Sequence, residues 1–227
     1  MRMSDCLAPF QRRYRADQFG YSSRVVFLEQ PVPPVDDWVE QAPRWSPDVD
    51  AYLAAYHRVG HPWLWADRLA GGRPAIERDL ERPEQVCWRI DRSGRLAGFC
   101  ELVLRADRQA EILHCGLVPD ARGRGLGRRL LTSALAGARA MGASRVWLHT
   151  CSEDSPAALA FYQAAGFRIV ATRLEWVIDA RRRGLLPASA GSAVDLPWTG
   201  AAAARAFSAD SGAGSDAARP PGSQPGS

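Results

Sequence analysis

The sequence contains no lysine, so all 29 of its basic residues other than histidine are arginines. This absence excludes a nucleotide-binding P-loop, which needs its lysine, and an enzyme that forms a Schiff base on a lysine amine. No apolar run approaches the roughly 20 residues that cross a bilayer, and no secretory leader pattern opens the chain. We therefore expect a soluble, cytoplasmic protein without a membrane partner.

The cysteines are few, odd in number and widely spaced, and they contain no CxxC pair. This pattern favours reduced thiols in the cytosol over a disulfide framework. His114 and His149 lie in predicted strands, and nothing in the sequence pairs them as metal ligands, so we expect no metal. The cysteines are Cys6, Cys87, Cys100, Cys115 and Cys151.

The length of 227 residues suits one domain with tails. Residues 1–21 carry arginines without clean periodicity, and we expect a loosely ordered lead-in there. Residues 185–227 are rich in Ala, Gly, Ser and Pro and have too little apolar surface to offset the entropy of ordering, so they predict a disordered tail. The domain itself is expected over residues 22–184.

Within the domain, the periodicity predicts a strand, several helices, a three-stranded antiparallel meander, and then helix, strand, helix, strand. The expected strands are 23–30, 85–90, 95–105, 110–118, 144–150 and 167–178. The expected helices are 50–60, 61–70, 75–82, 126–141 and 156–165, with Ser155 at the N-cap of the last.

The stretch VPDARGRGLGRRLL, residues 118–131, places three glycines and four arginines between a predicted strand and a predicted helix. It is not a dinucleotide fingerprint, because Arg128 stands where the third glycine belongs. What remains is Arg-x-x-Gly-x-Gly, and free N–H groups at the start of a helix favour a diphosphate there. From spacing alone, a turn that binds nothing stays open. Nucleic-acid binding is disfavoured, since the aromatic side chains of a base-stacking surface are missing.

This loop and its flanks resemble the GNAT superfamily of acetyl-CoA-dependent N-acetyltransferases. The flanks are AEILHCGLVP before the loop and SPAALAFYQAAGF after it, and the resemblance runs from about Cys87 to Val177. It implies an α+β fold of three α/β/α layers, whose mixed, mostly antiparallel sheet is splayed at the acetyl-CoA site. It also implies pantetheine pairing at Leu117 and Val118, and a contact or a helix cap at Ser155, where the family has Asn. The implied pyrophosphate loop consists of Arg122, Gly123, Arg124, Gly125, Leu126 and Gly127.

The resemblance further implies direct transfer of acetyl to a primary amine, with a general base that removes the amine proton. Glu111 matches the base of the histone-acetylating members, and Glu101 on the neighbouring strand is its rival. Tyr162 matches the tyrosine that protonates the departing thiolate, and a packing role for its ring stays open. The N–H near Leu117 matches the donor to the oxyanion.

The amine acceptor, a small molecule or a protein, is not determined by the sequence, and a homodimer is left open. The competing hypothesis is a coenzyme A-binding sensor module that has no catalytic activity. Trp38, Trp45, Trp63 and Trp65 lie in the weakly matched N-terminal part, where they either pack in the core or line an acceptor pocket.

Overall fold

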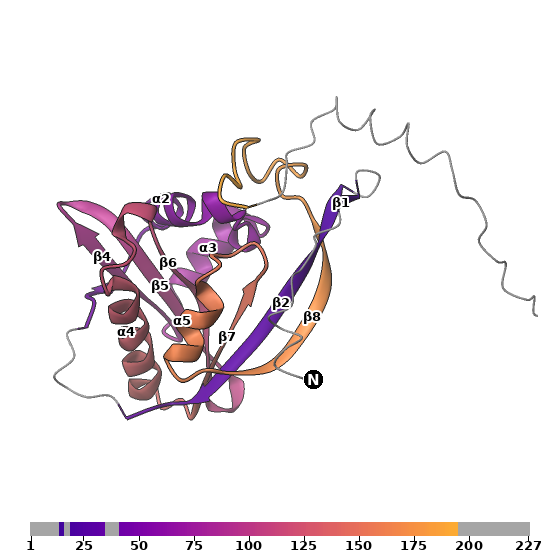
Figure 1. Cartoon of the computed structure of the whole chain (residues 1–227). Helices are drawn as coiled ribbons and strands as arrows, with labels where there is room; N and C mark the ends of the chain where they lie inside the picture. Colours follow the sequence, from indigo (N-terminus) through magenta and orange to yellow (C-terminus); the bar gives the residue numbers. More distant parts are fainter. Residues whose placement is uncertain (1–13, 16–18, 35–40, 195–227) are drawn as a thin grey trace, which may run out of the picture.

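A computed structural model of the chain describes residues 14–15, 19–34 and 41–194. Its centre is one eight-stranded sheet in the order β1-β2-β7-β6-β5-β4-β3, with β8 paired to β2 (Figure 1). The strands are β1 Tyr14–Arg15, β2 Gly20–Pro31, β3 Arg44–Trp45, β4 Gln85–Arg92, β5 Arg95–Arg105, β6 Gln109–Leu117, β7 Arg145–Cys151 and β8 Arg168–Ile178. The helices are α2 Val49–Gly60, α3 Gly72–Leu80, α4 Leu126–Ala140 and α5 Ala158–Ala164, with short 3-10 turns η2 His61–Trp63, η3 Asp67–Leu69, η4 Ala106–Arg108 and η5 Pro119–Ala121.

The sheet is mixed, because β6 and β7 run parallel while the other neighbouring strands run antiparallel. β4, β5 and β6 form the predicted meander. Ser93 and Gly94 both adopt positive φ at the β4–β5 turn, as a tight hairpin requires. β2 comes from the N-terminal part of the chain and lies between β7 and β8, antiparallel to both. The α+β class and the mixed, mostly antiparallel sheet are confirmed.

Side chains alternate between the two faces of the sheet along β5, so their contacts identify the helices that cover each face. Phe99 and Glu101 point to the face of α2, where Tyr52 contacts both. Cys100 points the other way, as does its cross-strand neighbour Trp88, whose ring lies against Gly137 of α4. The sheet is therefore the middle of three layers, with α2 and α3 on one side and α4 and α5 on the other.

Two sequence expectations about local structure are wrong. Residues 61–70 form the turns η2 and η3 instead of one helix, because Leu64 turns the chain through the left-handed region at φ 63°. α5 begins at Ala158 with Ala157 as its N-cap, so Ser155 does not cap the helix. β2 also starts three residues earlier than expected, inside the segment assigned to the lead-in.

The expected boundary of the tail at Leu185 is wrong as well. Leu186 and Ala190 are buried in a small cluster with Tyr21, Leu64 and Ala180. The N–H of Gly191 donates to the His61 carbonyl, and the N–H of Ala193 donates to that of Pro62. The packed domain therefore continues to residue 194, and the rest of the expected tail lies outside the described residues. Across the described ranges, no helix is long and apolar enough to cross a membrane.

We expect Gly137→Ala to lower the melting temperature, although alanine normally favours a helix. A Cβ at Gly137 would collide with the buried ring of Trp88. Overpacking of this kind costs about 1–3 kcal/mol, which exceeds the gain in helix propensity of roughly 0.8–1 kcal/mol. Thermal unfolding checks this, with the exposed Arg139→Ala on the same helix as the control. An unchanged or higher melting temperature in Gly137→Ala would contradict it.

Candidate functional site

The sheet opens between β6 and β7. The two strands pair over only three residues each, Gln109 to Glu111 with Arg145 to Trp147. Leu113 then forms a β-bulge in β6, because Glu101 on β5 pairs with His114 while Leu102 pairs with Ile112. A bulge bends its strand, and here it carries β6 away from β7 while the pairing with β5 continues. The gap is a cleft of about 520 Å³.

The hydrogen-bond alternation on β6 determines which backbone groups face the cleft. The N–H of Val118 donates to the Ala97 carbonyl at 2.9 Å, so every second residue counted back from Val118 bonds to β5. The N–H and C=O groups of Cys115 and Leu117 therefore point into the gap. The backbone of Leu117, predicted to pair with pantetheine, thus faces the gap. Val118, for which the same pairing is predicted, has its N–H committed to Ala97, and its carbonyl accepts from Ala121.

The glycine loop lies at the end of this cleft, between η5 and α4. Gly123 and Gly125 have φ of 70° and 75°, and a Cβ at either position would meet no atom within 4 Å. No side chain caps α4, so its first N–H groups have no intrahelical or side-chain acceptor. Open space, free N–H groups and the positive end of the helix dipole suit a diphosphate. The loop thus fits the pyrophosphate of coenzyme A.

The arginines and the remaining loop residues have distinct positions. Arg122 lines the cleft, stacks 5.0 Å from the Trp63 ring centroid, and reaches the Leu117 carbonyl at 3.4 Å. Arg124 is exposed, whereas Leu126 packs against the core. Gly127 lies close to Phe161 and Leu117, at 3.6 Å and 3.7 Å from an added Cβ, so its small size lets α4 start close to α5 and β6.

Tyr162 and Ser155 line the cleft on the α5 side. Tyr162 is buried, and burial together with the nearby Cys115 and Asp154 raises the pKa of its phenol well above the ordinary value. It therefore stays protonated at neutral pH and can act as a proton donor. Its ring also packs against Phe161 and Phe167, at centroid distances of 5.2 Å and 5.9 Å. Packing and a role in the cleft are thus compatible for this residue.

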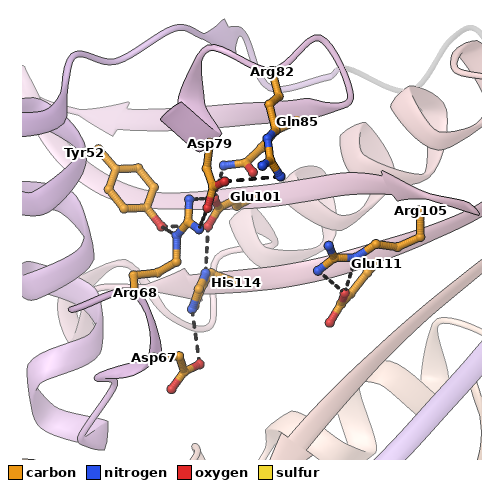
Figure 2. A network of polar contacts seen from close by, with 10 residues as sticks. All are labelled: Tyr52, Asp67, Arg68, Asp79, Arg82, Gln85, Glu101, Arg105, Glu111 and His114. Carbon is orange, nitrogen blue, oxygen red and sulfur yellow. Dashed lines mark hydrogen bonds and ion pairs between the residues drawn. The ribbon is translucent and has the colours of Figure 1, made fainter. Parts of the chain in front are cut away.

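A buried polar network occupies the opposite face of the sheet (Figure 2). Glu101 has no exposed surface, and its carboxylate contacts four polar side chains. The partners are Tyr52 Oη at 2.7 Å, Arg68 Nη2 at 3.0 Å, Gln85 Nε2 at 2.6 Å and His114 Nδ1 at 2.7 Å. Burial alone would raise the pKa of Glu101, but His114 and Arg68 hold it below its ordinary value. Glu101 is therefore an ionised anchor with no surface left for substrate.

His114 connects this network to the cleft. Its Nδ1 faces Glu101, its Nε2 lies 3.7 Å from Asp67 Oδ2, and the ring lines the cleft beside Trp65. Burial lowers the pKa of the imidazole, but the two carboxylates outweigh it and raise the pKa to about 9. The Asp67 carboxylate is largely exposed at the cleft, and its interaction with His114 lowers its pKa to about 2. His114 is thus a proton-carrying group that reaches the cleft.

Glu111, the expected base, lies elsewhere. Arg105 holds its carboxylate through Nη2 at 2.6 Å and Nε at 2.8 Å, apart from the network around Glu101 (Figure 2). Glu111 is the last β6 residue paired with β7, and it does not line the cleft. Sequence reasoning identified Glu101 as the rival but did not assign a role to His114, because Asp67, Glu101 and His114 are far apart in the sequence.

The tryptophans divide between the two expected roles. Trp63 and Trp65 line the cleft, and Trp65 Nε1 donates to Asp154 Oδ1 at 3.2 Å. Trp45 packs against Phe99 in the core, and Trp38 lies outside the described residues. Among the residues that the structure describes, no group of three or more His, Cys, Asp or Glu side chains is placed to hold a metal ion.

Comparison with known proteins identifies similar sequences and folds. Residues 45–167 match the model of the acetyltransferase (GNAT) family. The mycothiol acetyltransferase of Thermobispora bispora is 32% identical over 149 residues, which cover 60% of this chain and 46% of that protein. That of Nocardioides sp. is 38% identical over 130 residues, covering 57% and 37%. The chain thus spans less than half the length of these relatives.

A solved structure of a GCN5-related N-acetyltransferase from Sphaerobacter thermophilus matches with a TM-score of 0.49 at 21% identity. The match covers 67% of this chain and 50% of that one.

We expect Glu101→Gln to lower the pKa of His114 and the free energy of unfolding. Without the Glu101 charge, burial of the imidazolium is less well compensated, and Arg68 loses one of its two carboxylate partners. Breaking a buried pair in this way costs about 3–5 kcal/mol. NMR titration of the imidazole and denaturant unfolding measure the two effects. Asp50→Asn, which removes an exposed ion pair with Arg73, is the control and should leave both unchanged.

Proposed function

Because the chain belongs to the acetyltransferase (GNAT) family, we propose that it is an acetyl-CoA-dependent N-acetyltransferase that moves an acetyl group to a primary amine. One observation carries the proposal. A single cleft is lined by Arg122 of the glycine loop and Tyr162 on the α4/α5 face, and by His114 and Asp67 on the α2/α3 face. Coenzyme and amine would then enter from opposite faces of the sheet and meet where β6 and β7 part.

The residues on the α4/α5 side hold the coenzyme. The N–H groups from Gly123 to Gly127 bind its pyrophosphate, and each hydrogen bond to a charged oxygen contributes roughly 1.5–3 kcal/mol. Arg122 and Arg124 supply positive charge around it, and Ser155 offers a hydroxyl from the start of α5. Leu117, whose N–H is open to the gap and whose carbonyl accepts one long hydrogen bond from Arg122 at 3.4 Å, pairs with the pantetheine arm. Acetyl-CoA supplies an already activated thioester, so the protein needs no covalent nucleophile.

The residues on the α2/α3 side prepare the amine. An amine of pKa about 10.4 costs about 4.6 kcal/mol to deprotonate at pH 7, which a positioned base helps to offset. His114 in its neutral form accepts this proton at Nε2, while Glu101 holds the ring through Nδ1. The exposed carboxylate of Asp67 attracts the ammonium form of the acceptor to the same place. Glu111 remains the alternative base, with its ion pair to Arg105 as the argument against it.

The departing thiolate and the developing oxyanion are served by residues of β6 and α5. Tyr162 donates its phenolic proton to the sulfur in concert with cleavage of the carbon–sulfur bond, because its raised pKa makes the phenol a weaker acid than a thiol. The free N–H of Leu117 faces the gap and donates to the oxyanion. Both groups line the same cleft as His114. Attack and departure can therefore proceed without movement of the sheet.

The acceptor belongs to the amine class, and the names of the curated relatives suggest the amine acceptor of mycothiol acetyltransferases as the first candidate. An acetyl-CoA thiol-release assay across amino-sugar, amino-acid, peptide and aminothiol pools tests this. Release with one or more pools supports an enzyme. Full acetyl-CoA binding without release from any pool would favour the sensor module.

We expect Gly125→Glu to weaken acetyl-CoA binding by about 10²–10⁴-fold, because a carboxylate in the loop displaces two or more hydrogen bonds to phosphate. Gly142→Glu is a matched control. Gly142 has φ of 76°, and an added Cβ there would meet no atom within 4 Å. It lies just past the C-terminal end of α4. It carries the same backbone strain without touching the loop. Calorimetry measures both variants, and equal affinities would overturn the assignment of the coenzyme loop.

We expect the turnover of the native protein to rise with pH and to level off near pH 9. His114 has a pKa of about 9, so it accepts a proton only in the growing neutral fraction. His114→Gln should lower turnover and remove this rising limb while acetyl-CoA affinity stays intact. Glu111→Gln is the comparison and should keep the limb. If Glu111→Gln removes the limb and His114→Gln keeps it, the base is Glu111.

The free energy of unfolding should also depend on the titration of His114, but it should fall as the pH rises. The pKa of His114 is about 9 when folded and about 6.5 when unfolded, so the folded state binds the proton more tightly. Its stabilising contribution is complete below pH 6.5 and is lost as the pH rises through about 9. Denaturant unfolding of the native protein and His114→Gln from pH 6 to 10 should show a steeper fall for the native protein. Parallel curves would contradict the raised pKa.

A further inference from the structure

Two cysteines face each other across β5 and β6 beside the cleft. Cys100 and Cys115 are direct partners in the antiparallel register, so their side chains lie next to each other on the same face of the sheet. Counting from the bond between Val118 and Ala97, they form a non-hydrogen-bonded pair, the pair type with the closer side chains. Cα atoms in such a pair are about 4.5 Å apart, within the range of about 4.4–6.8 Å that a disulfide needs.

The two thiols differ in their access to solvent. Cys115 is half-buried and lines the cleft, whereas Cys100 has no exposed surface and lies behind it. A reagent in the cleft therefore meets Cys115 first, and Cys100 can react only with the sulfur of Cys115. Sequence spacing does not predict this pairing, because the cysteines are widely spaced along the chain.

Cys115 also lies on the α4/α5 face, close enough to Tyr162 to influence its phenol electrostatically. In the proposed function this is the end of the cleft that receives the sulfur of coenzyme A. The backbone of Cys115 faces the same gap as that of Leu117. A disulfide that carries a pantetheine arm and the adenosine diphosphate part of coenzyme A could therefore use the loop at Gly123 to Gly127 and bring its sulfur to Cys115.

We propose that Cys115 is a thiol–disulfide exchange site for coenzyme A disulfide and that Cys100 is its resolving thiol. The thiolate of Cys115 attacks one sulfur of the disulfide. The new bond joins Cys115 to one coenzyme A, the disulfide bond between the two coenzymes breaks, and the other coenzyme A leaves as a thiolate. Cys100 then attacks the sulfur of Cys115, forms the Cys100–Cys115 bond and releases the second thiolate. Both leaving groups take up the protons that the cysteines lose. Coenzyme A disulfide is reduced, and the cysteine pair is oxidised.

The burial of Cys100 sets the order of events. Its apolar surroundings and neighbouring Cys115 raise the pKa of Cys100 well above the ordinary value, so its reactive thiolate is scarce. The mixed disulfide at Cys115 therefore accumulates before it is resolved. The mixed disulfide places a coenzyme group in the cleft beside Tyr162, so it blocks entry of acetyl-CoA until Cys100 or a thiol reductant releases that group.

The test treats the reduced full-length chain with coenzyme A disulfide and follows it by intact mass, peptide mapping and free-thiol titration. The native protein should first gain one coenzyme A on Cys115 and then lose that mass, with two of its five thiols consumed. Cys100→Ser should stop at the adduct, and Cys115→Ser should gain none. Cys100→Ala is a second form of the first variant, and the melting temperature of each variant shows that it is folded.

Cys151→Ser is the matched control, since Cys151 also lines the cleft and is half-buried. It should react as the native protein does. Gly125→Glu should slow the reaction with coenzyme A disulfide at least about tenfold and leave that with hydroxyethyl disulfide unchanged, since the latter has no phosphate. An adduct mapped to Cys151, an adduct in folded Cys115→Ser, or no reaction of the native protein would each overturn the proposal.

This inference rests on the coenzyme site of the proposed function, and the two fail separately. If the chain acetylates no amine but forms the adduct at Cys115, the enzyme assignment fails and the exchange site stands. If it acetylates an amine and gains no adduct, the exchange site fails alone. If the chain neither acetylates an amine nor forms the adduct, and calorimetry detects no binding of coenzyme A, both proposals fail because the glycine loop does not bind the coenzyme.

Discussion

The unpaired stretch of β6 is the constraint on which the other features of the site depend. β6 must stay hydrogen-bonded to β5 along its length and yet leave β7 after Glu111, and the bulge at Leu113 allows both. The strand therefore presents one free edge inside the protein. An unpaired edge in a buried place needs hydrogen-bond partners, and a ligand that lies along it can supply them. The free edge at Leu117, the opening between the strands and the position of the loop beyond Val118 all follow from this departure.

The second constraint is electrostatic. Glu101 is fully buried, which would be costly for an isolated carboxylate. Arg68 compensates it with a planar guanidinium that bridges Glu101, Asp79 and the Tyr52 hydroxyl. The chain has no lysine, so its buried cations other than histidine are arginines, whose rigid fork suits such a site. Held on one side by this anchor, His114 has a raised pKa and a defined ring orientation at the cleft. Stability and the protonation of His114 thus depend on the same buried charge.

Much of the fold was predictable because its strands and helices have clear periodicity and punctuation. The meander and α4 lie within a few residues of their predicted bounds, and the loop was predicted from its glycine spacing between a strand and a helix and from its family resemblance. In the structure Gly123 and Gly125 adopt positive φ, which glycine tolerates. Predictions failed where contacts between segments that are distant in the sequence determine the local structure. The turns after α2 and the packing of residues 185–194 depend on contacts with each other, and local composition does not reveal such contacts. Glu111 matched a pattern, but the pattern does not show that Arg105 occupies its carboxylate.

The sequence by itself determined the order of the elements, the family resemblance and the diphosphate-compatible loop, because each is a local property written in consecutive residues. Only the tertiary structure decided which side chains meet. The contacts of His114 with Glu101 and Asp67, and the pairing of Cys100 with Cys115, depend on strand register and on the face to which each residue points. The bulge at Leu113 sets the register of both pairs. Residues that are apart in the chain therefore form a proton-carrying group on one face of the sheet and a pair of thiols on the other.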